Sequence, residues 1–326
     1  MDVLSDVLRA VRLTGAVYFD VRARAPWVAE TPPVAVYAAN IMPGFDQVIA
    51  FHIVMEGCCW AQIPDTAESP VFLDTGDVAI FPAGDGHVMG TDPGRRADPN
   101  LSVYRQRRDQ PLPYVFNEYG GDGEPAWLAC GYLGCDSRPF NPVTESLPRL
   151  MHVQAPKDGR HLVHDLIRAA LQESDRPRAG SETILAKLSE LMFLEAIRDH
   201  IEGLPADAKG WLAGLRDRHV GAALRVMHGR PAERWTLDAL AREVGLSRSA
   251  FAERFSERMG TPVMQYLANW RLQLAARMIE NQSVSIARAA AEVGYESEAA
   301  FNRAFKRQVG VPPGAWRRSR MVSLHA

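Results

Sequence analysis

Two histidines and a carboxylate in the first third of the chain are the residues best suited to bind a metal ion. His52 and Glu56 lie four residues apart in the segment FHIVMEG, and His87 follows a stretch rich in glycine and proline that begins at Gly76. Imidazole and carboxylate groups bind divalent transition metals, so these three side chains are candidate ligands. A histidine that points inward can also serve only the packing of a small barrel, so both interpretations stay open.

Four cysteines raise the question of thiol chemistry. Cys58 and Cys59 are adjacent, and four residues separate Cys130 from Cys135, a spacing typical of neither zinc sites nor thioredoxin-like motifs. Four cysteines in 326 residues are also too few for a disulfide scaffold. We interpret them as buried small apolar residues, the common role of free cysteine, and a thiol sensor is the alternative.

Positive charge is concentrated at the carboxyl end of the chain. The whole sequence has a net charge of −2, but residues 216–326 have a net charge of +8 and residues 1–215 a net charge of −10. An acidic part joined to a basic part predicts two domains with separate tasks, and the basic part is a candidate for binding a polyanion such as DNA. No apolar run approaches the roughly 20 residues of a spanning helix, and no secretory signal is recognisable. We therefore expect a cytoplasmic protein without a membrane partner.

The elements expected to position these residues change in type along the chain. Short β-type runs bounded by Gly and Pro turns predict strands at 34–37, 47–55, 71–73, 78–81, 101–104 and 127–133. Evenly spaced short strands without intervening helices indicate a sandwich or barrel. Apolar residues at helical spacing then predict helices at 161–173 and 182–201, with Ser181 as the cap of the second. The second helix either covers the barrel or pairs two protomers, because periodicity does not identify its packing partner.

After Arg216 the sequence is helical throughout and contains an internal repeat. Leu237 and Gly245 recur as Ile286 and Gly294 at an offset of 49 residues, and the later positions recur at an offset of 50. These later pairs are Phe251 and Phe301, Phe255 and Phe305, Gly260 and Gly310, Pro262 and Pro312, and Tyr266 and Trp316. Each copy predicts a helix, a tight turn at the glycine and a second helix capped by Ser247 or Ser297. Two helix-turn-helix units are thus predicted, joined by a helix within 264–280.

The stretch 218–318 resembles the AraC/XylS-type transcriptional regulators. The resemblance rests on Arg271, Ala275, Ile286, Ala290, Gly294, Tyr295, Ser297, Phe301, Arg303, Phe305, Lys306, Gly310, Pro312, Pro313, Trp316 and Arg317. It implies that the second helix of each unit reads double-stranded DNA in a major groove. Placing the family's roles on this chain gives base contacts at Arg248, Ser249, Ala252, Glu253, Glu298, Asn302 and Arg303. The same placement gives phosphate contacts at Arg254, Lys306, Arg307, Arg317 and Arg318.

The first part of the chain resembles the cupin-type sensor domains that are fused to such regulators. The segment from Gly76 to His87 is similar to the second cupin motif, but Ala50 stands where metal-binding cupins have a histidine. We therefore expect no cofactor and no metal at His52, Glu56 and His87. The resemblance implies instead a small-molecule effector in a pocket, for which the candidates are Trp27, Tyr37, His52, Trp60, His87 and Tyr104.

Together these patterns and the two resemblances imply a multidomain α+β protein. The expected parts are a cupin-like sensor barrel at 1–155, a helical region at 156–201 that is a candidate for dimerisation, a linker at 202–215 and an all-α DNA-binding domain with two helix-turn-helix units at 216–320. The expected function is effector-controlled transcription regulation without enzymatic activity, by a homodimer that acts with RNA polymerase. The alternatives are a cupin metalloenzyme with a DNA-binding appendage and a DNA-binding protein that responds to no ligand.

Overall fold

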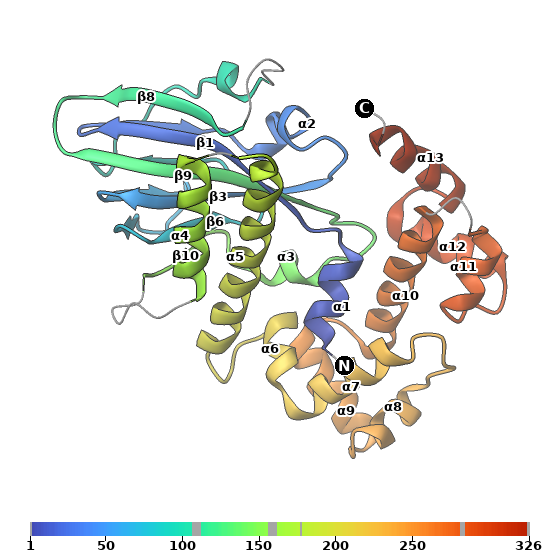
Figure 1. The fold of residues 1–326 in the computed structure, drawn as a ribbon. Coiled ribbons are helices and arrows are strands. Elements are labelled where there is room, and N and C mark those ends of the chain that lie inside the picture. Colours follow the sequence, from blue (N-terminus) through green and yellow to red (C-terminus); the bar gives the residue numbers. More distant parts are fainter. Residues whose placement is uncertain (1, 106–111, 156–161, 177, 281–283, 325–326) are drawn as a thin grey trace. The chain divides into compact units, whose positions relative to one another are not determined.

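The computed structural model describes residues 2–105, 112–155, 162–176, 178–280 and 284–324 (Figure 1). The chain divides into two compact units, and each is built from separate stretches of sequence. Residues 13–135 and 147–199 form the sheet unit, and residues 1–12, 136–146 and 200–326 form the helical unit. Among the described residues, no helix is long and apolar enough to cross a membrane.

The sheet unit contains two sheets. The six-stranded sheet has the order β10-β6-β3-β9-β1-β8, and the four-stranded sheet has the order β2-β7-β4-β5. All the pairings are antiparallel except that of β1 with β8. The strands are β1 (Thr14–Arg24), β2 (Val28–Thr31), β3 (Gln47–Glu56), β4 (Cys59–Gln62), β5 (Val71–Leu73), β6 (Val78–Phe81), β7 (His87–Gly90), β8 (Tyr114–Gly120), β9 (Pro125–Cys135) and β10 (Met151–Val153).

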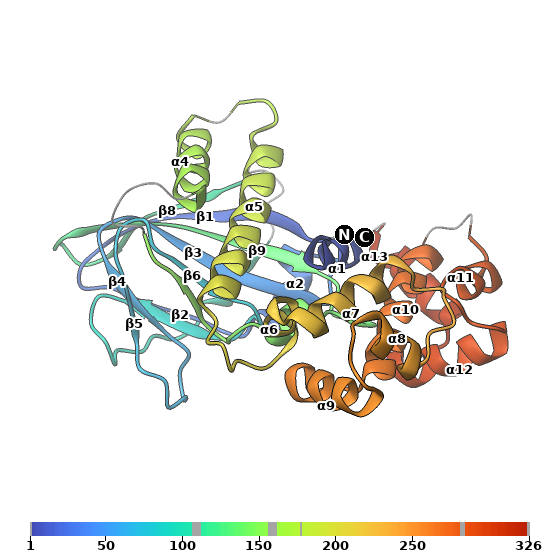
Figure 2. The same ribbon diagram turned by 90° about the horizontal axis from the view of Figure 1, so that it is seen from below.

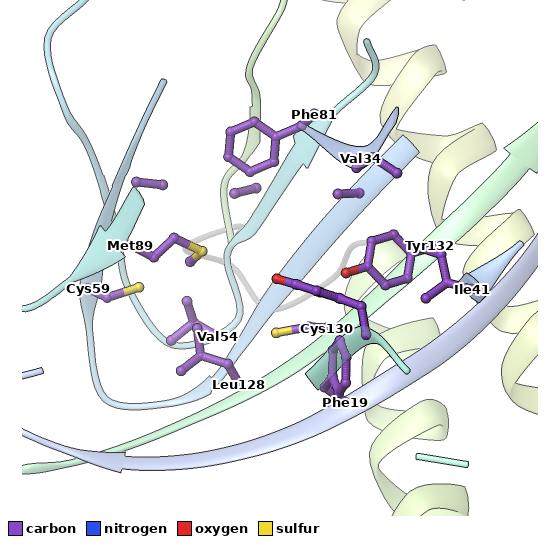
Figure 3. Packing of buried hydrophobic residues seen from close by; sticks show 14 of the residues in the cluster. Phe19, Val34, Ile41, Val54, Cys59, Phe81, Met89, Leu128, Cys130 and Tyr132 are labelled. Carbon is purple, nitrogen blue, oxygen red and sulfur yellow. The ribbon is translucent and has the colours of Figure 1, made fainter. Parts of the chain in front are cut away.

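The core of this unit lies between the inner faces of the two sheets, where side chains from many strands meet (Figure 3). In β3, the alternate residues Val48, Ala50 and Val54 join this cluster. Residues 48–54 are nevertheless buried without interruption, which indicates that the outer face of the strand is covered too. The turn before β7 depends on Gly84, whose φ is +68° and whose Cβ would lie 2.6 Å from the carbonyl oxygen of Val48.

Two helices cover the outer face of the six-stranded sheet, opposite the four-stranded sheet (Figure 2). They are α4 (Leu162–Asp175) and α5 (Ser181–Gly203). The helix expected at 182–201 is thus confirmed, and 161 lies outside the described residues. Ser181 is the first residue of α5 rather than its cap, and its hydroxyl donates to Glu173 at the end of α4.

Two of the expected strands are wrong. Val34–Val36 and Leu101–Tyr104 form 3₁₀ helices. The first follows two prolines, which lack the N–H that a strand would donate. The second starts at Asn100, whose side chain accepts from the N–H of Ser102 at 3.1 Å and so stabilises a local turn. A short helix α2 (Ala38–Ile41) follows the first 3₁₀ helix.

The helical unit contains ten helices among the described residues. They are α1 (Val3–Ala10), α3 (Pro142–Ser146), α6 (Trp211–Arg216), α7 (Arg218–Gly229), α8 (Leu237–Glu243), α9 (Arg248–Met259), α10 (Val263–Glu280), α11 (Ile286–Glu292), α12 (Glu298–Val309) and α13 (Pro313–Leu324). The predicted helix-turn-helix pairs are α8 with α9 and α11 with α12, and α10 joins them. Helix α6 begins inside the stretch 202–215 that was expected to be a linker. Its residues Trp211 and Leu212 are buried in this unit, so this part of the stretch is packed and is not a free linker.

The turn between the two helices of each pair follows the expected chemistry. Gly245 and Gly294 follow α8 and α11 with φ of 71° and 88°, a conformation that glycine adopts without strain. The N–H of the next residue, Leu246 or Tyr295, reaches back to the carbonyl of Ala241 or Ala290. This closure satisfies a carbonyl that the helix end would otherwise leave free, and it sets the angle between the two helices.

Candidate nucleic-acid interface and barrel cavity

Helices α9 and α12 are each fixed by a cap and by an aromatic stripe. The hydroxyls of Ser247 and Ser297 accept the N–H of the third helical residue at 3.3 and 3.2 Å. In both helices two phenylalanines and one further apolar residue are buried on one side, and the other positions are exposed or partly exposed. The buried residues are Phe251, Phe255 and Met259 in α9, and Phe301, Phe305 and Val309 in α12.

The residues expected to contact bases lie on the outer sides of these two helices. Arg248, Ser249, Glu253, Glu298 and Arg303 are exposed, and Ala252 and Asn302 are partly buried. Both helices lie on the lower side of α10 in Figure 2. The structure therefore brings the seven residues to accessible positions on a shared scaffold, and their contacts with bases stay predictions.

The residues expected to contact phosphate fall into two groups. Arg254 donates through its Nε and Nη2 to Asp217, and Arg317 donates to the carbonyls of Ile279 and Val284 at 2.9 and 2.6 Å. These two guanidinium groups hold helices together, so their geometry favours a structural role. Lys306, Arg307 and Arg318 are exposed, as a phosphate contact requires.

Asp217 is a residue that the sequence analysis missed. It caps α7 by accepting the N–H groups of His219 and Val220 at 3.0 Å, and it also receives the fork of Arg254 from α9. Burial favours the neutral form, but the hydrogen bonds from Arg254 and the two amides outweigh it and lower the pKa of Asp217. The pair locks the recognition helix α9 to α7. The sequence signal that could have located it is an aspartate directly before a helix.

The exposed side chains of α9 and α12 carry donors and acceptors that can form hydrogen bonds with base edges. The Arg303 guanidinium has no ion-pair partner among the described residues, and it can donate two parallel hydrogen bonds to a guanine edge. Asn302 can pair with adenine, and Glu253 can accept from the amino group of cytosine. The exposed cations of α12 add attraction to the phosphates without sequence preference.

The sheet unit contains a cavity of about 180 Å³ on the inner side of the barrel. Phe19 and Val21 of β1, together with Leu128, Cys130 and Tyr132 of β9, form much of its wall. Figure 3 shows Phe19 of β1 close to Cys130 and Tyr132 of β9, with Met89 of β7 farther away beside Cys59. The remaining lining residues are Trp27, Ala29, Glu30, Thr31, His52, Met89, Asp98, Asn100, Val103, Tyr104 and Phe116.

Three of the six expected pocket residues line this cavity, namely Trp27, His52 and Tyr104. The other three lie behind its wall or elsewhere in the core. Tyr37 stacks on Tyr104 with 3.8 Å between ring centroids, and His87 stacks on Phe81 at the same distance. Trp60 is 1% exposed and packs in the core. The sequence pattern did not separate wall residues from those that support them, because both kinds are inward-facing aromatic residues.

His52 and His87 form a directly bonded pair. Their Nε2 atoms lie 2.7 Å apart, and Nδ1 of His87 lies 2.9 Å from the carbonyl oxygen of Asp85. Burial lowers the pKa of His87 to about 4 and that of His52 well below its ordinary value, so both rings are neutral near pH 7. Glu56 is separated from this pair, because a β-irregularity between Val54 and Glu56 leaves its side chain exposed. The described residues contain no cluster of three side chains suited to hold a metal.

The cysteines divide by burial. Cys58 is exposed, whereas Cys59, Cys130 and Cys135 are buried. Burial raises the pKa of Cys59 to about 12 and that of Cys130 well above its ordinary value. Buried neutral thiols are poor nucleophiles, so these two fit the packing role that the sequence suggested.

The contacts of the chain's start with the helical unit had no sequence signal. Gln273 on α10 is 1% exposed, and its Nε2 donates to the carbonyl of Ala10 at 2.9 Å. Its Oε1 accepts from the N–H of Phe140 at 3.0 Å. Asp136 binds Arg12 at 2.6 Å and Arg320 at 3.0 Å. Residues 1–12 and 136–146, which we call the connector segments, are thereby fastened to α10 and α13.

Comparisons with known proteins agree with this architecture. Residues 2–202 match the family model described as Cupin, and residues 240–319 match the model described as Helix-turn-helix domain. A putative AraC-like transcription regulator of Streptomyces lividans is 32% identical over 272 residues, which cover 83% of this chain and 87% of that protein. Its counterpart in Streptomyces antibioticus is 30% identical over 84% of this chain and 88% of its own length. The HTH-type transcriptional regulator AlkR of Acinetobacter baylyi is 27% identical over 97% of this chain and 99% of its own.

Proposed function

This chain belongs to the AraC-like transcription regulators, and on that premise we propose that its barrel cavity binds a small-molecule effector that changes how α9 and α12 contact double-stranded DNA. The observation that carries the proposal is the pair of capped helices with buried aromatic stripes and exposed outer sides. They belong to a stretch, residues 216–326, whose net charge is +8. Such a surface can bind the phosphate backbone and present side chains to base edges.

The barrel senses rather than catalyses in this proposal. His52 and His87 bond to each other, and Glu56 is exposed, so these three groups do not converge on one point. Aromatic and aliphatic side chains form most of the cavity wall. A mostly apolar cavity with a few polar groups is typical of a binding site for a small molecule.

The connector segments supply a route from the effector to the DNA-binding helices. Strand β1 begins two residues after Arg12, and strand β9 ends directly before Asp136, so two cavity-lining strands continue into the segments fastened to α10. An effector can shift the protein only between states that it binds with different affinity. We propose that these states differ in how firmly Gln273 holds the two segments.

We propose a homodimer that pairs through α5 and that acts with RNA polymerase at promoters. Ile184 and Leu191 are 41% and 48% exposed, and they lie seven residues apart and so on one side of α5. A second copy of the chain would cover this stripe. Leu191→Glu should then yield a monomer in size-exclusion chromatography with light scattering. Phe72→Glu, at another exposed apolar residue of the sheet unit, should leave the dimer intact; a dimeric Leu191→Glu protein would contradict the proposed interface.

The DNA-binding part is tested with a fragment recovered by genome-wide DNA capture. Fluorescence anisotropy should show that Arg303→Ala weakens specific binding by about 1–3 kcal/mol and relaxes the choice at one base pair. Lys306→Ala should weaken binding to every sequence alike and reduce the salt dependence. Arg95→Ala removes an exposed cation from the sheet unit and should change neither the specific binding nor the salt dependence. Equal effects of the Arg303 and Arg95 changes would refute the proposed reading surface.

A further inference from the structure

The cations of α9 are held by carboxylates of the helical unit. Arg254 donates to Asp217 at 2.8 Å, and Arg258 lies 3.8 Å from the same carboxylate. Arg258 also donates to two backbone carbonyls at 3.0 and 3.1 Å. Arg248, at the start of the helix, lies 3.7 Å from Asp238 on α8. All three cations of α9 therefore have a negative partner within their own unit.

The cations of α12 lie free on its outer side. Arg303, Lys306 and Arg307 are exposed, and none of them has an ion-pair partner among the described residues. The one acid of this helix is its first residue, Glu298, where a carboxylate complements the positive end of the helix dipole. Three cations against one acid give α12 a formal charge of +2.

This difference gives the two recognition helices unlike electrostatic surfaces. When the paired side chains Asp217, Asp238 and Lys209 (the partner of Glu257) are included, the formal charges of α9 cancel, whereas those of α12 do not. Exposed charges act over roughly 8 Å at physiological ionic strength, so a neutralised pair attracts little from farther away. A phosphate that approaches α12 meets uncompensated cations. Counterion release, which drives sequence-independent binding, is therefore expected mainly from α12.

Glu253 is an acid on the outer side of α9 without a partner of its own. It is exposed, it lies in the middle of the helix, and it has no ion pair in the part of the chain that the structure describes. Beside DNA, a carboxylate is repelled by the phosphates and loses hydration in the groove. A donor from a base must replace that hydration, or the contact costs free energy.

The donors in the major groove decide which base can satisfy this carboxylate. Cytosine presents an N4 amino group from which a glutamate can accept, whereas guanine presents only acceptors and thymine an acceptor and a methyl group. Adenine presents a donor beside the N7 acceptor, a pair that suits the amide of glutamine better than a carboxylate. An acid is thus a selective reader, because unfavourable contacts discriminate between partners as favourable ones do.

We propose that the two recognition helices α9 and α12 divide the binding of DNA between them. Helix α12 supplies the sequence-independent attraction to phosphate, and α9 discriminates through Glu253, which tolerates only a groove that offers a cytosine amino group at its position. The inference rests on the proposed function, because it assigns unequal roles to the two halves of the same DNA-binding surface. Binding to arbitrary DNA is then held by α12, and α9 engages where the sequence matches.

Salt dependence separates the two helices in the full-length protein. Fluorescence anisotropy with a duplex of scrambled sequence is measured over a range of NaCl concentrations. Arg307→Gln should reduce the slope of log K against log salt by about 0.9, the value for one phosphate contact. Arg248→Gln, the same change at an exposed arginine of α9, should reduce the slope by less than about half as much. Equal reductions by the two variants would overturn the proposal.

Base preference tests Glu253 directly. Specific binding is measured with a fragment recovered by genome-wide DNA capture and with duplexes in which each of its base pairs is changed in turn. Glu253→Gln should bind the scrambled duplex about threefold more tightly, because one repulsive charge is gone, and should move the preference at one position from cytosine to adenine. The control Glu243→Gln removes an exposed acid from α8, where it pairs with Arg230, and should change neither quantity.

The outcomes separate this inference from the function on which it rests. A Glu253→Gln protein that keeps every base preference of the unchanged protein, or that binds scrambled DNA no more tightly, overturns the role of Glu253. An unchanged protein that binds no captured fragment more tightly than scrambled DNA refutes the proposed function instead.

Discussion

Gln273 offers the sharpest test of how the connector segments are held. Gln273→Leu keeps nearly the same volume but removes both the donor to Ala10 and the acceptor for Phe140. Each of these backbone groups would then be buried without its side-chain partner, at a cost of about 1–3 kcal/mol. Leucine adds apolar burial that offsets part of the loss. We therefore expect the free energy of unfolding to fall by about 3 kcal/mol.

Urea unfolding followed by tryptophan fluorescence measures this change, and hydrogen exchange of the α1 amides locates it. The control is Gln265→Leu, the same substitution at an exposed position of the same helix, where the side chain of Gln265 donates to that of Asn269. Exposed substitutions usually change stability by less than about 0.5 kcal/mol. If both variants unfold at the same urea concentration with the same slope, the two bonds of Gln273 do not hold the segments and the reasoning is refuted.

Three further predictions concern the helical unit. Phe305→Ala should lower the free energy of unfolding by about 3–5 kcal/mol, measured with denaturant, because Phe305 is fully buried in the cluster that joins α10 to α13. A decrease as small as that caused by Phe72→Ala, at an exposed residue, would contradict this. Ser247→Ala should destabilise α9 by about 1 kcal/mol and Ser247→Asn should restore it, as measured by hydrogen exchange. Burial lowers the pKa of His228 to about 3 in the folded protein. In the unfolded chain the pKa returns to about 6.5, so the unfolded chain binds the proton as the pH falls and the folded protein does not. The free energy of unfolding should therefore fall by about 2 kcal/mol between pH 7 and pH 5. In the His228→Gln variant the denaturation midpoint should depend less on pH, and an unchanged dependence would show that His228 is not buried neutral.

The helix-turn-helix pairs could be predicted from the sequence because their determinants are local. The glycine at each turn, the serine cap and the phenylalanines four residues apart all act within one or two helical turns. The repeat doubled the evidence, since each feature recurs at an offset of 49 or 50 residues. Exposure of the outer face followed from burial of the aromatic face, and the resemblance to the AraC/XylS-type regulators placed the candidate base contacts on that face.

The barrel was predicted less completely because its determinants are distant in sequence. Strands β3, β5, β6 and β9 were located by their apolar runs, but β1, β2, β4, β7, β8 and β10 were missed. Strand β1 contains Asp20, Arg22 and Arg24, charges that its apolar alternation does not outweigh. The cavity depends on which inward residues leave space between them, and that is a property of the packed sheets. Trp27 and Trp60 are alike in sequence terms, yet only Trp27 lines the cavity.

The free energy that an effector can supply limits how far apart the two regulatory states can lie. A ligand present at 100 times its dissociation constant stabilises the state that it binds by about 2.7 kcal/mol. The two regulatory states must therefore lie within about that range, or the effector could not shift them. Removing the two hydrogen bonds of Gln273 destabilises the state that contains them by about 3 kcal/mol, a similar amount. We expect Gln273→Leu to fix the protein in one state, so that its DNA affinity is the same with and without a small molecule identified by its binding to the full-length protein, while this molecule still binds because Gln273 does not line the cavity. A Gln273→Leu protein whose DNA affinity still responds to this molecule as the unchanged protein does would show that the signal bypasses the connector segments.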